Sequence, residues 1–176
     1  QAMKTRKVDV AIIGGGTAGM VAYGEVRKHT GSIALIEGGP FGTTCARVGC
    51  MPSKLLVAPA EARHRLQALP AFGIGSDAGK VDGVALMRRV RAERDRFVGF
   101  ATDTVAAFDP GHIVRAYARF ADAHRLHLDA PDADQAPAAD IECIEAARIV
   151  IASGSRPMIA DALKPAGDRL ISSDEV

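Results

Sequence analysis

Two cysteines and a lysine are the side chains best suited to chemistry. Cys45 and Cys50 are five residues apart, and Lys54 follows Cys50 by about one helical turn. In a regular helix this separation gives a rise of about 7.5 Å, which places the Cα atoms beyond the roughly 7 Å limit for a disulfide. Either the thiols do not pair, or the first helical turn is distorted, for which Pro52 supplies a reason because it cannot donate to the carbonyl of Val48. A helix start and a nearby lysine lower a thiol pKa, so the segment suits a reactive dithiol.

Other interpretations of these cysteines stay open on spacing alone. A zinc site requires closer spacing and a second ligand pair, which the sequence does not offer. A thioredoxin-type pair has C-x-x-C spacing. Two buried structural thiols also fit, since a free cysteine packs like a small hydrophobic residue. The third cysteine, Cys143, lies in an apolar predicted strand, and we expect it to be a packed structural thiol.

A glycine-rich loop is the second candidate site. The segment 14–19, GGGTAG, fits G-x-G-x-x-G, in which Gly14 permits a tight turn, Gly16 lets a phosphate approach the backbone and Gly19 lets the helix pack on the strand. Free N–H groups and the helix dipole then face a pyrophosphate. Glu37 ends the next strand, where an acid accepts hydrogen bonds from ribose hydroxyls and disfavours a 2′-phosphate. This context predicts a dinucleotide site, FAD or NAD, against the alternative of a glycine-rich turn in an unrelated α/β protein.

The elements that must position these residues follow from apolar periodicity. A strand at 8–13, a helix at 17–29 and a strand at 32–36 predict a βαβ unit. A helix to about Leu69 and an amphipathic helix at 84–108 follow, separated by a glycine-rich connection. The predicted later strands are 113–120, 124–129, 141–146 and 148–152, with a polar loop at 130–140 and a loop-like remainder. We therefore predict an α/β, Rossmann-like fold with a parallel sheet, a helical layer and an antiparallel β-meander.

Composition excludes several classes of protein. Hydrophobic residues make up 48% of the 176 residues, which excludes a wholly disordered chain. The net charge of +1 offers no basic field for nucleic acid. No apolar run approaches the roughly 20 residues that span a bilayer, and no secretion signal precedes Val8, so we expect a cytoplasmic protein without a membrane partner. Residues 1–3 look like a cloning remnant.

Two segments resemble motifs of a known family. Residues 43–54, TTCARVGCMPSK, resemble the redox-active disulfide signature of the flavoprotein disulfide reductases, or class I pyridine nucleotide-disulfide oxidoreductases, which include dihydrolipoamide dehydrogenase and mercuric reductase. The family pattern is Gly-Gly-Thr-Cys-x-Asn-x-Gly-Cys-x-Pro-Ser/Lys-Lys. Residues 149–157, IVIASGSRP, resemble its second flavin motif, Ala-Thr-Gly-Ser-x-Pro. Thr43 replaces a glycine, Ser153 replaces a threonine, and Arg47 replaces an asparagine, which leaves the substrate class open.

The resemblance implies an FAD-binding fold over residues 4–176 and a role for each matched residue. Cys45 is implied to attack the substrate disulfide, and Cys50 to contact the flavin and receive its electrons. Lys54 is implied to lie near flavin N5. The residues implied to hold FAD are Gly14, Gly16, Thr17, Ala18, Gly19, Glu37, Gly38, Gly42, Thr43, Thr44, Lys54, Ala118, Ser153 and Gly154. No metal ligand is implied.

The expected function is that of the FAD-binding part of an NAD(P)H-dependent disulfide oxidoreductase, nearest to dihydrolipoamide dehydrogenase, acting on a disulfide such as lipoamide. The parent is expected to be a homodimer. The sequence contains no second G-x-G-x-x-G and no His-x-x-x-x-Glu pair, so we expect NAD(P) and dimerisation domains to be absent and the chain alone to be inactive. The alternatives are a mercuric reductase-like enzyme, a non-catalytic FAD-binding module, and a flavin monooxygenase-like protein that would not need the cysteines.

Overall fold

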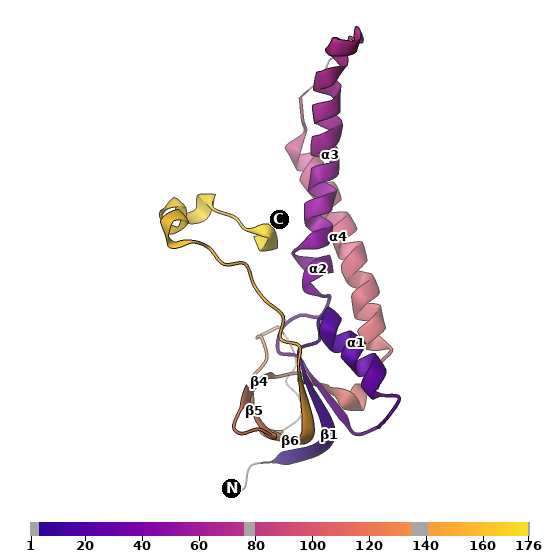
Figure 1. The fold of residues 1–176 in the computed structure, drawn as a ribbon, viewed down its shortest axis with the longest axis vertical. Coiled ribbons are helices and arrows are strands. Elements are labelled where there is room, and N and C mark those ends of the chain that lie inside the picture. Colours follow the sequence, from indigo (N-terminus) through magenta and orange to yellow (C-terminus); the bar gives the residue numbers. More distant parts are fainter. Residues whose placement is uncertain (1–3, 76–79, 135–140, 176) are drawn as a thin grey trace. The chain divides into compact units, whose positions relative to one another are not determined.

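A computed structural model of the protein describes residues 4–75, 80–134 and 141–175 (Figure 1). The chain divides into two units, each described here by itself. The sheet unit comprises residues up to Thr43 together with Phe100–Arg156, and the helical unit comprises Thr44–Gly99 together with the segment from Pro157. The predicted cloning remnant at 1–3 and parts of the loops at 70–83 and 130–140 lie outside the described residues.

One six-stranded sheet organises the sheet unit, in the order β3-β2-β1-β6-β5-β4. The central strand β1 (Thr5–Ile13) pairs in parallel with β2 (Ile33–Ile36) and with β6 (Cys143–Ile151), and β2 pairs in parallel with β3 (Ile113–Val114). Helix α1 (Thr17–Val26) connects β1 to β2, as the βαβ pattern predicted. The antiparallel part consists of β4 (Tyr117–Phe120) and β5 (Arg125–Asp129) beside β6. The predicted α/β fold class is thus confirmed.

The prediction of a single antiparallel strand over 113–120 is wrong. The segment contains β3 and β4, which form the two opposite edges of the sheet although only Arg115 and Ala116 separate them along the chain. The sheet must therefore curl, so that its edges approach each other where these two residues cross. Apolar alternation predicts that such a segment is a strand. It does not predict which strands the segment pairs with, because that depends on long-range pairing.

The separation of 141–146 from 148–152 is also wrong, because the two segments form the single strand β6. Its whole length runs beside β1, from Thr5 opposite Cys143 to Ile13 opposite Ile151. The exposed residues in the middle of β6 face solvent rather than ending the strand. Cys143 is fully buried, which confirms it as a packed thiol.

The remaining elements are helical. In the helical unit, α2 (Thr44–Arg47) and α3 (Cys50–Ala68) are followed by a 3₁₀ turn, η1 (Leu69–Phe72). Helix α4 (Gly83–Ala106) follows, and η2 (Pro110–His112) leads into β3. The segment after Arg156 was expected to be loop-like but contains the 3₁₀ helices η3 (Asp161–Arg169) and η4 (Ser173–Glu175). In the described part of the chain, no helix has the length and apolar character needed to cross a membrane.

Two apolar clusters lie in the sheet unit. One contains Val8, Ala11, Ala34, Ile36, Val114, Ala116, Leu126, Ile144 and Ala146. The other adds α1 and the end of α4 to the sheet and contains Val10, Ile12, Tyr23, Ile33, Leu35, Val105 and Phe108. In the second cluster the rings of Tyr23 and Phe108 stack, with their centroids 4.1 Å apart. The central strand contributes to both clusters, so the core forms around β1.

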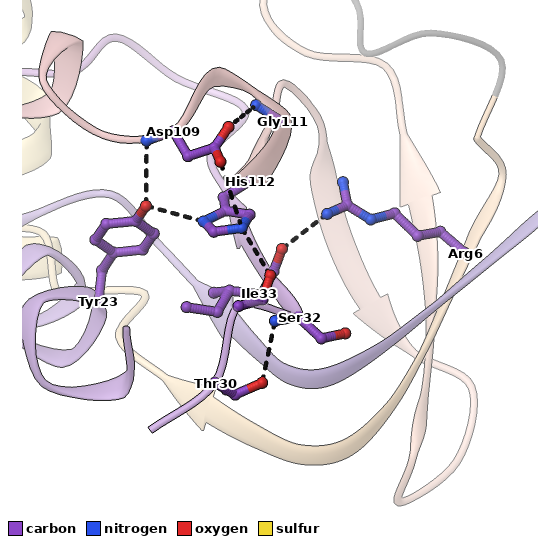
Figure 2. A network of polar contacts seen from close by, with 9 residues as sticks. Arg6, Tyr23, Thr30, Ser32, Ile33, Asp109, Gly111 and His112 are labelled. Atoms are coloured by element: carbon purple, nitrogen blue, oxygen red, sulfur yellow. Dashed lines mark hydrogen bonds and ion pairs between the residues drawn. The ribbon is translucent and has the colours of Figure 1, made fainter. Parts of the chain in front are cut away.

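A partly buried polar chain ties the end of α4 to α1 and to the turn before β2 (Figure 2). His112 Nε2 lies 2.9 Å from the carbonyl oxygen of Gly31, which only accepts hydrogen bonds, so we assign the ring proton to Nε2. His112 Nδ1 then accepts from the Tyr23 hydroxyl at 2.9 Å, and that oxygen accepts from the Asp109 N–H at 3.2 Å. The His112 side chain is only 15% exposed and links three segments.

Tyr23→Phe is expected to destabilise the fold by about 1–3 kcal/mol, because it leaves His112 Nδ1 and the Asp109 N–H without their partner inside the protein. Urea unfolding followed by circular dichroism measures the loss. His29→Gln is the control, since its exposed contact with Glu25 contributes little. Equal stability of Tyr23→Phe and the wild-type chain would contradict the assigned network.

Candidate functional site

The carboxyl ends of the parallel strands meet at one cavity in the sheet unit. Gly14 follows β1, Glu37 follows β2 and Ser153 follows β6, while the crossing from β3 to β4 passes the same edge. The cavity measures about 240 Å³ and is lined by Ile13, Gly14, Ile36, Glu37, Gly38, Ala116, Tyr117, Ala118 and Ser153. Ligands of open α/β sheets bind in a crevice at this edge. The structure therefore brings together five residues of the predicted cofactor set: Gly14, Glu37, Gly38, Ala118 and Ser153.

The glycines of the first loop have three different surroundings. Gly14 has φ +103°, and a Cβ there would lie 2.2 Å from the Ala152 carbonyl oxygen. A Cβ at Gly19 would lie 1.8 Å from the Gly14 carbonyl oxygen, so α1 begins in direct contact with the end of β1. A Cβ at Gly16 would meet nothing within 4 Å. These surroundings agree with a tight turn at Gly14, an open approach at Gly16 and close helix packing at Gly19.

The first turn of α1 presents its backbone N–H groups without a side-chain cap. Gly16 is the N-cap residue and offers no side chain, and the first turn contains no acidic residue. Thr17 and Ala18, which begin the helix, are exposed. Together with the open space at Gly16, this arrangement fits a phosphate held by backbone amides and the helix dipole.

Glu37 holds the loop after β1 and the turn after β2 together. Its Oε2 accepts from the Gly15 N–H and its Oε1 from the Gly39 N–H, each at 2.8 Å. A carboxylate has about four acceptor positions, so each oxygen keeps one for a further donor. The predicted contact with ribose hydroxyls is chemically compatible with this placement.

The cavity wall also contains a residue that the sequence did not single out. Tyr117 lines the cavity, and its hydroxyl donates to Asp132 Oδ1 at 2.8 Å. This hydrogen bond is the main reason that the pKa of the Tyr117 hydroxyl is raised above its ordinary value, with burial and the charge of Asp132 adding to it. An aromatic residue beside Ala118 was the only signal for Tyr117, and Asp132, within a polar loop, gave none.

Gly42, Thr43 and Gly154 belong to the sheet unit but do not line this cavity. Gly42 and Gly154 have positive φ angles of 125° and 71°. Thr43 has φ +58°, the only positive φ among the described non-glycine residues. A β-branched residue in the left-handed region carries about 1–3 kcal/mol of strain. This gives a physical reason for the glycine at the corresponding position of the family pattern.

The predicted dithiol lies in the helical unit, at a break between two helices. Cys45 is in α2 and Cys50 is the first residue of α3. Between them, the N–H groups of Val48 and Gly49 both donate to the Thr44 carbonyl, at 3.0 and 2.8 Å. Gly49 has φ −116° and ψ −100°, outside the helical region. The distorted first turn is thus confirmed.

Both cysteines are free thiols. A hydrogen bond with the Cys50 side chain, followed by burial and by the charge of Cys50, raises the pKa of the Cys45 thiol above its ordinary value, and the positive charge of Lys54 opposes the increase. The expectation that the helix start lowers the thiol pKa is therefore not met at Cys45, because a neighbouring sulfur outweighs the other influences. Thr44, Cys45, Cys50 and Lys54 lie together in the helical unit.

Two substitutions should move the pKa of Cys45 in opposite directions. Cys50→Ala removes the dominant cause of the increase and should lower this pKa, whereas Lys54→Met removes a favourable charge and should raise it. The pH dependence of Cys45 alkylation by iodoacetamide, followed by mass spectrometry of the cysteine peptide, measures both.

Lys80→Gln is the control for this experiment, because Lys80 is exposed and does not contribute to the pKa of Cys45. If the alkylation midpoint moved the same way in Cys50→Ala and Lys54→Met, the assigned electrostatics would be wrong.

Comparison with known families and proteins places this geometry in context. Residues 8–173 match the family model described as pyridine nucleotide-disulphide oxidoreductase. The family comprises flavoproteins that use FAD, with NAD(P)H as the electron donor of the full-length enzymes. The FAD predicted from the motifs is therefore the cofactor of the family.

Relatives with different substrates are similar to this chain. It is 37% identical to a mercuric reductase of Streptomyces lividans over 155 residues, covering 85% of the chain and 30% of that protein. It is 32% identical to a dihydrolipoyl dehydrogenase of Pseudomonas aeruginosa, covering 96% of the chain and 35% of that protein. A mycothione reductase of Mycobacterium tuberculosis is 30% identical, with coverage of 96% and 35%. The chain thus spans about a third of the length of these relatives.

A solved structure shares the fold. It is a Cu(II) complex of the HOCl-induced flavoprotein disulfide reductase RclA from Escherichia coli, with a TM-score of 0.64 and 23% sequence identity. The match covers 89% of this chain and 30% of that chain. The two proteins therefore share a fold.

Proposed function

Since the chain belongs to the pyridine nucleotide-disulphide oxidoreductase family, we propose that it is the FAD-binding part of an enzyme that passes electrons from NAD(P)H to a substrate disulfide such as lipoamide. The observation that carries this proposal is the pair of free thiols, Cys45 and Cys50, at the break between α2 and α3. In the full-length protein we propose a homodimer, as is common in this family.

The cavity of the sheet unit supports FAD binding, because its residues suit the dinucleotide part of that cofactor. Gly14, Gly16 and Gly19, with the amides of Thr17 and Ala18, would hold the pyrophosphate at the start of α1. Glu37 and Gly38 would bind the adenosine ribose, and the backbone of Ala118 would contact adenine. Gly42, Thr43, Thr44, Ser153 and Gly154 are proposed to complete the contacts to the cofactor, and Lys54 to lie near its reactive ring.

The proposed chemistry at the dithiol balances as a disulfide exchange. The Cys45 thiolate attacks one sulfur of the substrate disulfide and releases the other as a thiol once it gains a proton. The Cys50 thiolate then attacks Cys45, which releases the second substrate thiol and leaves a Cys45–Cys50 disulfide. The electron pair that restores the dithiol would come from FAD, if held by the residues proposed above, with NAD(P)H as its source.

The raised pKa of Cys45 adds a requirement to this scheme. A raised pKa favours the protonated thiol, so a proton acceptor is needed before attack. The charge of Lys54 assists because it favours the thiolate. The His-x-x-x-x-Glu pair that the family resemblance implies would serve as that acceptor, supplied by the partner subunit.

Gly16→Ala is expected to leave the fold intact and to weaken FAD binding by at least tenfold, because the added methyl group enters space that is empty in the protein but needed by a phosphate. Gly24→Ala is the matched control, since Gly24 also lies in α1 and also has nothing within 4 Å of an added Cβ. Fluorescence titration with FAD measures both. Equal affinity of the two variants would contradict the phosphate site.

The dithiol role is tested by reducing the FAD-bound protein with dithionite under anaerobic conditions. Two-electron reduction should give a long-wavelength charge-transfer absorbance that depends on the Cys50 thiolate. Cys50→Ser should abolish it, whereas Cys143→Ser, which changes a buried thiol of the sheet unit, should retain it. A band that persists in Cys50→Ser would disprove the assigned role, and a chain that never takes up FAD would contradict the proposed FAD-binding function.

A mercuric reductase-like activity is the second candidate, favoured by the 37% identity to the Streptomyces lividans enzyme. A reduced dithiol is a good ligand for a soft metal ion such as Hg(II), so the same Cys45–Cys50 pair suits both activities. In the full-length protein, NAD(P)H oxidation driven by lipoamide and by Hg(II) distinguishes the two.

A further inference from the structure

The turn at Gly38 and Gly39 is held by residues far away in the sequence. The Gly38 carbonyl accepts from the Asp132 N–H at 2.9 Å, and the Gly39 carbonyl accepts from Arg115 Nη2 at 2.6 Å. The Tyr117 ring lies against Gly38 so closely that a Cβ there would be 2.5 Å from the ring. The turn therefore cannot shift without moving the loop after β5 and the start of β4.

Tyr117 and Asp132 close this arrangement through a side-chain hydrogen bond, the Tyr117–Asp132 latch, of 2.8 Å. Tyr117 is 45% exposed, Asp132 is exposed, and neither belongs to an apolar cluster of the sheet unit. An exposed bond of this kind contributes little to global stability. Its effect is local, on the backbone of the turn that it covers.

That turn determines the direction of the Glu37 carboxylate. Glu37 Oε1 accepts from the Gly39 N–H, and the latch meets Gly39 beside this oxygen: a Cβ at Gly39 would lie 3.4 Å from Glu37 Oε1, 3.5 Å from the Tyr117 hydroxyl and 3.6 Å from Asp132 Oδ2. Glu37 Oε2 is held independently by the Gly15 N–H. One carboxylate oxygen is thus oriented by the glycine loop and the other through the latched turn.

We propose that the Tyr117–Asp132 latch is a positioning device for ribose recognition, which holds Gly39 so that Glu37 presents its free acceptor positions to the hydroxyls of the adenosine ribose. This inference rests on the proposed FAD function, because it assumes that the cavity takes the adenosine part of a dinucleotide. Neither latch residue needs to touch the ribose. The latch acts through Gly39 and Glu37, so its loss should affect ligand hydroxyls rather than phosphates.

The test compares ADP with 2′-deoxy-ADP and 3′-deoxy-ADP by calorimetry in the wild-type chain, Tyr117→Phe and Asp132→Asn. We expect both variants to bind ADP roughly three- to tenfold more weakly, the equivalent of one hydrogen bond. The decisive readout is the ratio of the deoxy-ADP to ADP dissociation constants. In the wild-type chain this ratio should exceed one for the analogue that lacks the hydroxyl contacted by Glu37. In both variants the ratio should fall toward one.

Arg119→Gln is the matched control, because Arg119 pairs with Asp129 on the same β4–β5 hairpin without lining the cavity. It should leave both the affinity and the ratio unchanged. Hydrogen exchange at the Gly39 amide gives a ligand-free readout, and it should be faster in Tyr117→Phe and Asp132→Asn than in Arg119→Gln.

The outcomes separate the two proposals. A wild-type chain that binds FAD and ADP, with the same ratio in all variants, would overturn the latch and leave the FAD function standing. A wild-type chain that binds neither nucleotide would overturn the FAD function and the latch with it.

Discussion

The contact between Gly19 and the carbonyl of Gly14 is the constraint on which the site depends. A Cβ at Gly19 would lie 1.8 Å from that oxygen, so no other residue allows α1 to begin so close to the end of β1. This closeness turns the chain sharply, leaves the space in front of Gly16 open, and places the Gly15 N–H where Glu37 can accept it. The loop after β1 and the turn after β2 are therefore joined by one carboxylate.

The parts of this arrangement that the sequence predicted are local. The first strand, the glycine loop, α1 and Glu37 lie within about thirty-five residues, and their roles follow from turn geometry and apolar periodicity. Tyr117 and Asp132 were not predicted, because their importance depends on a crossing between the two edges of the sheet. The same reason explains the error over 113–120: a segment of alternating residues does not reveal that its two halves pair with different strands.

The break at Gly49 shows where simple helix geometry succeeded and where it failed. A regular helix cannot bring Cys45 and Cys50 together, and Pro52 identified the place where regularity would be lost. What the pattern did not supply was the electrostatics. A helix start and a lysine both favour a thiolate, yet the neighbouring sulfur has the larger effect on Cys45. The pKa in a dithiol depends mainly on the side chains in contact, which requires the three-dimensional structure.

The departures from the family signature are distributed unevenly about the dithiol. Gly49, Cys50, Pro52, Ser53 and Lys54 keep the pattern, whereas Thr43 and Arg47 flank Cys45 and depart from it. Both departures are locally unfavourable. The backbone of Thr43 is in the left-handed region, and the buried Nε atom of Arg47 has no hydrogen-bond partner in the described structure. Thr43 is among the residues proposed to contact FAD, so Arg47 is the departure that lies beside Cys45, the thiol proposed to attack the substrate. The buried Nε atom of Arg47, which has no hydrogen-bond partner among the described residues, directs the search for the substrate to the surroundings of Cys45.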